Sequence, residues 1–371
     1  MQRLFLWFSV WLALYVSGFA HATDAPPPDD EKPAPHVALL LPLKSALFGA
    51  SAETVRQGFL AAAGVDITNP QNLPVRVYAS FDEANDIVAL YRHAIANGAR
   101  AVAGPLTRSG VTALAAEQDI PVPTLALNVA DVPAVESMYF FGMSIEAEAR
   151  QVAQMAWRDG FRKALVISSG TPLAGRLRQT FESEWGRSGN ELLHAVEFSG
   201  DTGSLAAFAE LEDTAVFLAA ESATARRIRP YLPNKLPLYA TSQVFTGNDD
   251  TLTNYDLNGM RFVDMPWLLR ADHPAVMIYP RAVPPLPAER ERLYALGIDA
   301  FRLLQLLLNG SPGTALPLDG VSGDIRLDGH VFQRTPVPAT LVQGHAQLSN
   351  GRIGPALRLF PDQPAEPAAS P

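Results

Sequence analysis

The chain has 371 residues, a formal net charge of -9 and no cysteine. An acidic chain without a cluster of Lys or Arg is a poor nucleic-acid binder, because phosphate neutralisation supplies most of that affinity. The lack of cysteine excludes disulfides, a thiolate nucleophile, Cys-bound zinc and lipidation at an N-terminal cysteine. The length exceeds what one hydrophobic core usually supports, so we expect two domains.

Residues 1–22 are expected to be a cleavable export signal. They combine a basic start, an apolar run over 4–16 and a small-x-small ending that signal peptidase recognises. The alternative is a membrane anchor, but a bilayer-spanning helix needs about 20 apolar residues. Residues 23–35 then predict a disordered linker rich in Pro and acidic residues, and 361–371 a similar tail. We therefore expect an exported protein, soluble after cleavage, with no transmembrane segment in the mature chain.

From residue 36 onward, short apolar strands alternate with amphipathic helices. Residues 36–41 predict a strand that is buried on both faces, and Ser51 is expected to cap the helix that follows it. Further strands are predicted at 75–78, 101–103 and 123–127, with helices at about 87–98 and 109–118 between them. This alternation predicts a parallel, doubly wound sheet with right-handed crossovers.

The same alternation restarts near residue 145, which predicts a second α/β lobe. Its strands are expected at 163–168, 192–198, 215–219 and 237–240, and its helices at 145–158, 172–188 and 222–231. A long helix over 289–308 and a hairpin over 320–334, turning at Asp328-Gly329, complete the pattern. The predicted fold class is α/β, with two doubly wound parallel-sheet lobes.

The sequence lacks the motifs of several common enzyme classes. It contains no Walker loop, no G-x-G-x-x-G, no G-x-S-x-G, no Ser-x-x-Lys and no His-Glu-x-x-His. The seven histidines are scattered, so we expect no metal site and no cofactor, although a site assembled from distant residues stays open. Asp201-Thr202-Gly203 matches the aspartic-protease triplet, but that chemistry needs two carboxylates sharing a proton, and we interpret it as a turn. The sequence favours a binding or regulatory protein.

Side chains at the carboxyl ends of the predicted strands form a candidate interlobe cleft, because open α/β sheets bind ligands at these ends. Hydroxyl groups and helix N-termini there can hold a carboxylate or another anion. The alternative for each hydroxyl is that it caps its own helix. The first lobe contributes Lys44, Ser45, Phe48, Thr107, Ser109 and Asn128, and the second contributes Ser169, Thr171, Glu221, Ser242, Gln243 and Asp264.

Several stretches of the chain resemble known families. Residues 37–43, Gly49, 55–59, 104–106 and 320–329 resemble type I periplasmic binding proteins. Within that superfamily, the chain is similar to the LppC/LpoA family of penicillin-binding protein activators, through residues 123–128, 141–150, 156–157, 228–233, 239–243 and 262–267. Together these stretches span nearly all of residues 36–334.

The resemblance implies a first lobe of residues 36–141 plus 268–312 and a second lobe of 142–267 plus 320–360, with three crossovers forming the hinge. It also implies a non-enzymatic periplasmic regulator that activates a class A penicillin-binding protein, a peptidoglycan synthase, by protein contact. Members of the family are typically outer-membrane lipoproteins. Because this chain has no cysteine to lipidate, we expect outer-membrane association only through a partner.

The alternative function is a periplasmic solute-binding protein for a small polar ligand such as an amino acid. A solute-binding protein needs convergent polar groups from both lobes. A regulator can instead have a filled cleft and an exposed apolar patch. The apolar residues Leu43, Ala46, Leu47 and Phe48 in the first loop favour a filled cleft.

Overall fold

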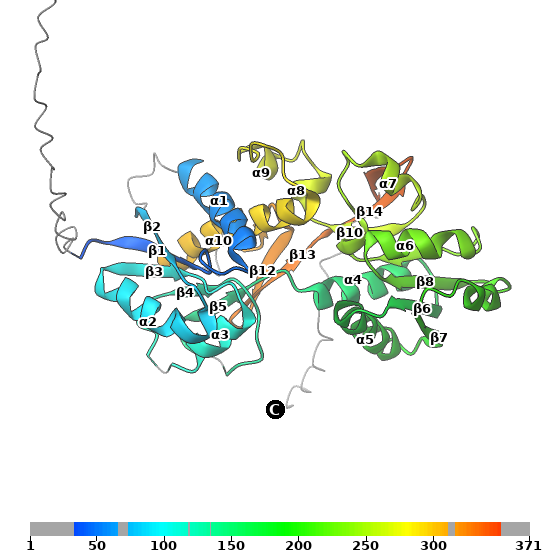
Figure 1. Cartoon of the computed structure of the whole chain (residues 1–371), viewed down its shortest axis with the longest axis horizontal. Helices are drawn as coiled ribbons and strands as arrows, with labels where there is room; N and C mark the ends of the chain where they lie inside the picture. The colour runs from blue at the N-terminus through cyan, green and yellow to red at the C-terminus, as the bar shows by residue number, and fades with distance from the viewer. Residues whose placement is uncertain (1–32, 66–72, 118, 134, 311–315, 350–371) are drawn as a thin grey trace, which may run out of the picture.

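Two α/β lobes lie side by side in the computed structural model, each built on one mostly parallel sheet (Figure 1). This confirms the predicted fold class. The structure describes residues 33–65, 73–117, 119–133, 135–310 and 316–349. The predicted signal peptide, most of the linker and the C-terminal tail lie outside the described residues.

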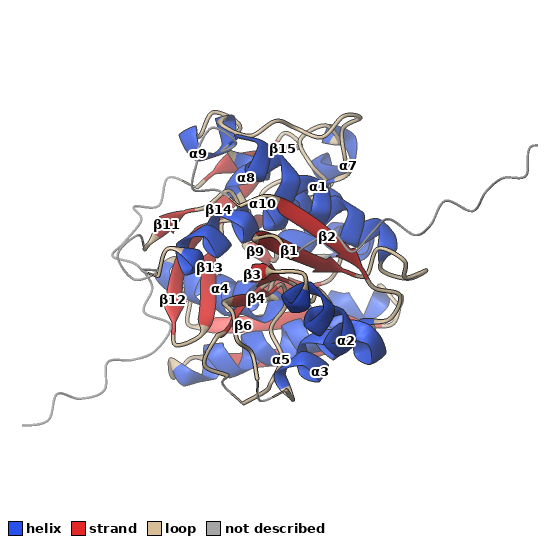
Figure 2. Cartoon of the chain, turned by 90° about the vertical axis from the view of Figure 1, so that its left-hand side faces the viewer, coloured by secondary structure: helices blue, strands red, loops and turns tan. Residues whose placement is uncertain are grey.

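The first lobe contains an eight-stranded sheet in the order β11-β12-β13-β5-β4-β3-β1-β2. Its strands are β1 (His36–Leu41), β2 (Val75–Ala79), β3 (Ala99–Ala103), β4 (Thr124–Ala126), β5 (Met138–Phe141), β11 (Leu318–Asp319), β12 (Asp324–Asp328) and β13 (Val331–Thr335). Its helices are α1 (Gly49–Val65), α2 (Glu83–Ala96), α3 (Arg108–Ala115), α8 (Pro266–Leu269), α9 (Pro274–Met277) and α10 (Ala288–Leu308). Helices α1 and α10 cover one face of the sheet, and α2 and α3 cover the other (Figure 2).

Strand β1 is buried on both faces because successive side chains of a strand point in opposite directions. Leu39 and its alternate neighbours pack against α1 and α10, whereas Leu40 packs against α2. The helix pair above the sheet is unusually close: a Cβ added to Gly58 on α1 would lie 1.9 Å from the carbonyl oxygen of Tyr294 on α10. Glycine is therefore required where these two helices cross.

The second lobe contains a seven-stranded sheet in the order β15-β14-β10-β9-β8-β6-β7. Its strands are β6 (Lys163–Ser169), β7 (Glu191–Phe198), β8 (Thr214–Ala219), β9 (Leu238–Ala240), β10 (Arg261–Asp264), β14 (Val337–Val342) and β15 (His345–Leu348). Its helices are α4 (Ile145–Arg158), α5 (Pro172–Arg187), α6 (Ser222–Ile228) and α7 (Thr251–Tyr255). Helices α4 and α5 cover one face, where Phe181 stacks on Phe217 with 4.3 Å between ring centroids.

Two expectations need correction. Residues 320–335 were expected in the second lobe, but β13 pairs with β5 through Phe332 and Phe141, and the side chain of Phe332 is buried in the first-lobe core. Helix α1 begins at Gly49 rather than after Ser51, because Ser45 already accepts the backbone N–H groups that start the turn into the helix.

The chain passes between the lobes three times. It leaves β5 for α4 through residues 142–144, returns from β10 to α8 through Met265, and crosses again from β13 to β14 through Pro336. These three short connections lie together at the centre of the molecule (Figure 1). We call the region around these three connections the interlobe border, and candidate site residues from both lobes lie there.

Candidate functional site

An open pocket of about 370 Å³ lies where the first crossover joins the two lobes. Its lining residues are Arg108, Asn128, Val129, Ala130, Asp131, Gly142, Met143, Ser144 and Glu146. Among the predicted cleft residues, Asn128 alone lines it. The Asn128 amide donates to the carbonyl of Leu106 at 2.9 Å, which fixes one wall of the pocket.

Glu146, at the start of α4, carries charge in this pocket. Its Oε1 lies 3.6 Å from Nη2 of Arg108 in the first lobe and 3.7 Å from Nε of Arg176 on α5. Both arginines are exposed, so water screens these two long ion pairs. Ser144 caps α4 by accepting the N–H of Ala147 at 3.1 Å. Polar groups from both lobes therefore converge here, as a small zwitterionic ligand would require.

Thr107 and Ser109 lie beside a buried carboxylate that the sequence did not reveal. The hydroxyl of Thr107 donates to Oε2 of Glu83 at 2.6 Å and accepts the N–H of Gly110 at 3.1 Å, and Ser109 Oγ lies 3.2 Å from it. Burial raises the pKa of Glu83, while hydrogen bonds from Thr107 and Leu106 oppose that rise. The capping alternative is therefore correct for Thr107, which holds the loop before α3 in place.

Lys44 and Phe48 lie on an exposed surface, and Ser45 between them is half-buried and accepts the N–H of Phe48. The Nζ atom of Lys44 lies 4.7 Å from the ring centroid of Phe81, in the loop after β2. Leu47 is 77% exposed, Phe81 66% and Phe48 42%. The expectation that the first loop fills the cleft is therefore wrong for Ala46, Leu47 and Phe48. We call Lys44, Leu47, Phe48 and Phe81 the loop patch.

Ser169, Thr171 and Glu221 come together at the ends of β6 and β8. Ser169 Oγ lies 3.3 Å from Thr171 Oγ1 and 3.4 Å from Glu221 Oε2. Thr171 accepts the N–H of Ala174 and so caps α5. Partial burial works to raise the pKa of Glu221, but hydrogen bonds from Thr224 and Ser169 hold it below its usual range. These residues form a local capping group and do not line the pocket.

Ser242 and Asp264 are buried at the border between the lobes. The N–H and hydroxyl of Ser242 donate to Glu148 Oε2 on α4 at 3.1 and 2.7 Å. Asp264 accepts from Nη2 of Arg292 on α10 at 2.6 Å. Gln243 lies in the short 3-10 turn Ser242–Val244 and is only half-buried. The structure thus places Ser242 and Asp264 in a buried charged network rather than in an open cleft.

Three charged members of this network were not predicted. Arg334 on β13 donates to Glu148 at 2.7 Å, and the side chains of this pair are 4% and 4% exposed. The third is Arg292. The burial of Arg334 could have been predicted from the sequence, because it lies two residues after the apolar Phe332 and so on the same, buried face of the strand. We call Glu148, Ser242, Asp264, Arg292 and Arg334 the hinge cluster.

The Arg292–Asp264 pair has the geometry of a charged pair. Nε of Arg292 lies 3.0 Å from Oδ1 and Nη2 lies 2.6 Å from Oδ2. Complete burial raises the pKa of Asp264, and Arg292 works against this rise. Burial would lower the pKa of Arg292, but Asp264 and Glu148 outweigh it and raise that pKa. The charged form of Asp264 and that of Arg292 are therefore each stabilised by the other residue of the pair.

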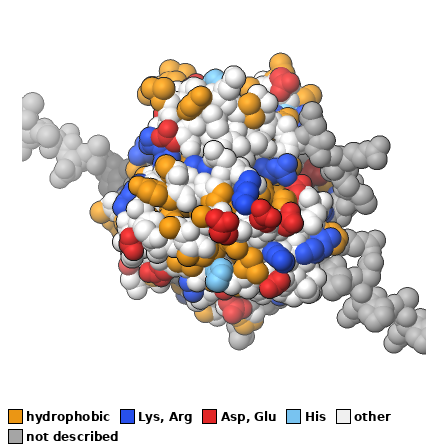
Figure 3. Space-filling model, turned by 90° about the vertical axis from the view of Figure 1, so that its right-hand side faces the viewer, with side chains coloured by type: hydrophobic (Ala, Val, Ile, Leu, Met, Phe, Trp, Pro, Cys, Tyr) orange, Lys and Arg blue, Asp and Glu red, His pale blue; other side chains and the backbone are white. Residues whose placement is uncertain are grey.

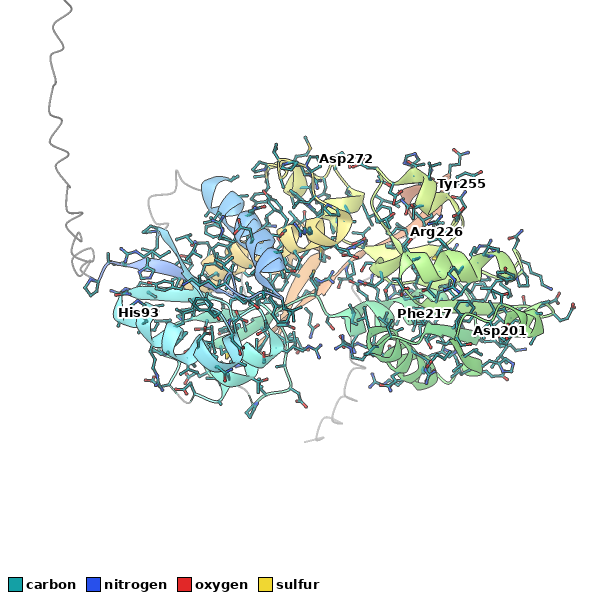
Figure 4. The ribbon with its side chains drawn as sticks, in the orientation of Figure 1. His93, Asp201, Phe217, Arg226, Tyr255 and Asp272 are labelled. Atoms are coloured by element: carbon teal, nitrogen blue, oxygen red, sulfur yellow. The ribbon has the colours of Figure 1, made fainter. Side chains whose placement is uncertain are left out.

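The aspartic-protease triplet is a turn, as predicted: Asp201 Oδ1 accepts the N–H of Gly203 at 2.9 Å. Asp201 lies at the outer end of the second lobe, far from the interlobe border (Figure 4). The end face of this lobe intermixes acidic and basic side chains (Figure 3). Among the described residues, no group of three or more His, Asp or Glu side chains could hold a metal ion, and no helix is long and apolar enough to cross a membrane.

Comparisons with solved structures support the two-lobed fold. A structure described as a "putative branched-chain amino acid ABC transporter" from Chromobacterium violaceum matches with 35% identity and a TM-score of 0.71, covering 83% of this chain and 100% of that one. The C-domain of LpoA from Haemophilus influenzae, described as "a regulator of PBP1A", matches with 24% identity and a TM-score of 0.68, covering 85% of this chain and 100% of that one. The second likeness shows the fold alone.

Sequence comparisons point to one family. The penicillin-binding protein activator LpoA of Haemophilus influenzae is 27% identical over 311 residues, which cover 79% of this chain and 51% of the relative. The protein of the same name from Photobacterium profundum is 27% identical over 340 residues, covering 81% of this chain and 54% of the relative. The chain thus spans about half the length of these curated relatives. The family profile described as "LppC putative lipoprotein" matches residues 30–212 and 204–334. The chain belongs to the LppC family.

Proposed function

We propose that this chain is a non-enzymatic periplasmic regulator that activates a class A penicillin-binding protein by direct contact. The observation that carries the proposal is the LppC match across both lobes, together with relatives named as activators of penicillin-binding proteins. The absence of serine-nucleophile motifs from the sequence supports a role without chemistry of its own. The buried carboxylates Glu83, Glu148 and Asp264 also have structural partners rather than free faces.

The loop patch is the surface that we assign to the synthase. Its three large apolar side chains come from two neighbouring loops at the carboxyl ends of β1 and β2, and the backbone of Lys44 is hydrogen-bonded to Ser80 in the second loop. Exposed apolar and aromatic groups beside a cation are typical of protein-binding surfaces. The position of Lys44 over Phe81 favours an acidic group on the partner at this point.

The test is glycan polymerisation by a purified class A penicillin-binding protein, measured with and without this chain. The unmodified chain should raise the rate. The double variant Leu47→Ser and Phe48→Ser should lose most of that stimulation and bind the synthase at least about tenfold more weakly, as expected when interface anchors are removed.

A matched control comes from the second lobe. Leu252 and Tyr255 on α7 are 86% and 58% exposed and lie apart from the loop patch, on the lobe where Figure 4 labels Tyr255. The double variant Leu252→Ser and Tyr255→Ser should stimulate the synthase as well as the unmodified chain. Failure of the unmodified chain to bind or stimulate any class A synthase would contradict the proposal as a whole.

A second candidate function is binding of a small zwitterionic solute in the pocket at the first crossover. The pocket volume of about 370 Å³ falls within the range of small-ligand sites, and Arg108 and Glu146 offer charges of both signs. A thermal-shift series with leucine, isoleucine and valine tests it. A rise in melting temperature of several degrees, lost in Glu146→Gln, would favour the solute-binding function.

A further inference from the structure

Two buried ion pairs connect the lobes through the interior of the molecule. Arg292 on α10 of the first lobe pairs with Asp264 on β10 of the second at 2.6 Å, with side-chain exposures of 7% and 0%. Arg334 on β13 of the first lobe pairs with Glu148 on α4 of the second at 2.7 Å. Each pair therefore has one charge in each lobe.

Ser242 joins the two pairs into one network. Its N–H and hydroxyl donate to Glu148, and its carbonyl accepts from Arg292 at 3.0 Å. Arg292 also donates to the carbonyl of Phe245 at 2.9 Å. The guanidinium of Arg292 thus bonds a carboxylate and two carbonyls of the second lobe at the same time, so its position is defined in both lobes.

The network reaches all three connections between the lobes. Glu148 lies in the first turn of α4, directly after the first crossover, and Asp264 ends β10 at the second. Arg334 lies at the end of β13, beside the third crossover, where Gln151 of α4 donates to the carbonyl of Pro336 at 2.8 Å. A rotation of one lobe against the other must therefore displace members of the hinge cluster.

A further buried carboxylate lies on the first-lobe side of the hinge cluster. Asp299 on α10 accepts the N–H and hydroxyl of Ser322 at 2.7 and 2.6 Å. Arg334 in turn lies 3.5 Å from the carbonyl of Ser322. Asp299 therefore fixes the position of Ser322 in the first lobe, next to the point where Arg334 pairs with Glu148 of the second lobe.

These contacts tolerate little movement. Hydrogen bonds weaken steeply when the donor and acceptor separate beyond about 3.2 Å or lose alignment. A buried charge that loses its counter-ion without gaining water is strongly destabilised. Bending at the crossovers would leave such charges on both sides of the border.

We propose that the hinge cluster locks the two lobes at one angle, so that the protein presents both lobes to its partner as a single rigid body instead of closing around a ligand. The proposal concerns conformation and holds whichever partner is bound. Its test is separate from that of the proposed function, because the angle between the lobes can be measured on the isolated chain without a synthase.

The absence of native cysteine makes a direct measurement possible. Spin labels attached to Ala89→Cys on α2 and Ser183→Cys on α5, both exposed helical positions in different lobes, report the interlobe distance by pulsed electron paramagnetic resonance. The otherwise unmodified chain should give one narrow distance distribution. An unlocked variant that also carries Glu148→Gln, Arg334→Met, Asp264→Asn and Arg292→Met should give a distribution about twofold wider or displaced.

Arg108→Gln is the matched control, because Arg108 also pairs across the lobes, with Glu146, but at an exposed site. It should leave the distribution narrow. A broad or two-peaked distribution for the otherwise unmodified chain overturns the lock, and so does an unlocked variant that folds and keeps the narrow distribution. If the fourfold variant does not fold, the double variant Glu148→Gln with Arg334→Met replaces it. The width of the distance distribution in the labelled chain with an intact hinge cluster still tests the proposal by itself.

Discussion

The two lobes touch through ion pairs of two kinds, which differ in their access to water. At the pocket, Glu146 of the second lobe lies 3.6 Å from the exposed Arg108 of the first lobe. In the hinge cluster, carboxylates and arginines of the same chemistry lie 2.6 and 2.7 Å apart and are almost fully buried. Exposed pairs contribute little because water screens them, whereas removing one member of a buried pair strands the other. Position rather than residue type therefore decides which pairs control the relation between the lobes.

The largest expected effect comes from Arg292→Met. This change leaves Asp264 buried without its cation, and the free energy of unfolding should fall by about 3–5 kcal/mol. Urea denaturation at neutral pH measures the loss. Combining the change with Asp264→Asn removes the stranded charge and should restore most of the stability. A loss below about 1 kcal/mol for Arg292→Met alone would show that the pair is not buried as described.

A double-mutant cycle on Arg334 and Glu148 measures the interaction energy of the second ion pair of the hinge cluster. Arg334→Met and Glu148→Gln should each destabilise the protein, and the double variant should lose less than the sum, with a coupling of about 1–3 kcal/mol. Glutamine keeps an acceptor for Ser242, so the coupling reports the charge pair rather than that hydrogen bond. Additive losses would contradict direct pairing.

Glu83 provides a buried carboxylate that accepts hydrogen bonds from Leu106 and Thr107. Glu83→Gln should cost about 1–2 kcal/mol, because the amide N–H₂ group faces N–H donors that need an acceptor. Burial raises the folded-state pKa of Glu83, so the folded state binds the proton more tightly than the unfolded state does. The stability advantage of the natural chain over Glu83→Gln should therefore be largest at acid pH and decrease as pH rises from about 4.3 through the raised pKa. Urea denaturation of both proteins across this range tests the sign.

The smallest effect is expected at the pocket rim. Arg108→Gln should change the free energy of unfolding by no more than about 1 kcal/mol, and by less in high salt, because its pair with Glu146 is exposed. Parallel denaturation curves at low and high ionic strength provide the measurement. A loss as large as that of Arg292→Met would remove the distinction between the two kinds of pair.

Local patterns predicted most of the fold. Strands such as β1 and β6 are apolar runs that only a sheet covered on both faces can bury, and the residues at their ends predict caps such as Thr107 and Thr171. Strands β14 and β15 were missed because both are partly exposed, and because β14 contains Pro338, a residue that is unusual inside a sheet.

The hinge cluster could not be predicted in the same way. Its pairs join residues 28 and 186 positions apart in the chain, so they exist only once both lobes have formed. Ser242 and Asp264 were identified as site residues because they end strands, but nothing local indicated that arginines from the first lobe would cover them. Without a sign of these arginines, the sequence led us to expect an open ligand cleft at Ser242 and Asp264.

The late hairpin has a consequence for biosynthesis. Strands β12 and β13 complete the first sheet, and β14 and β15 complete the second, with a single residue between β13 and β14. Neither sheet is therefore whole until these four late strands are available. Folding must therefore wait for contacts of very long sequence separation, which are slow to form. A protein shortened before residue 324 would lose β12 and β13 from the first lobe and β14 and β15 from the second.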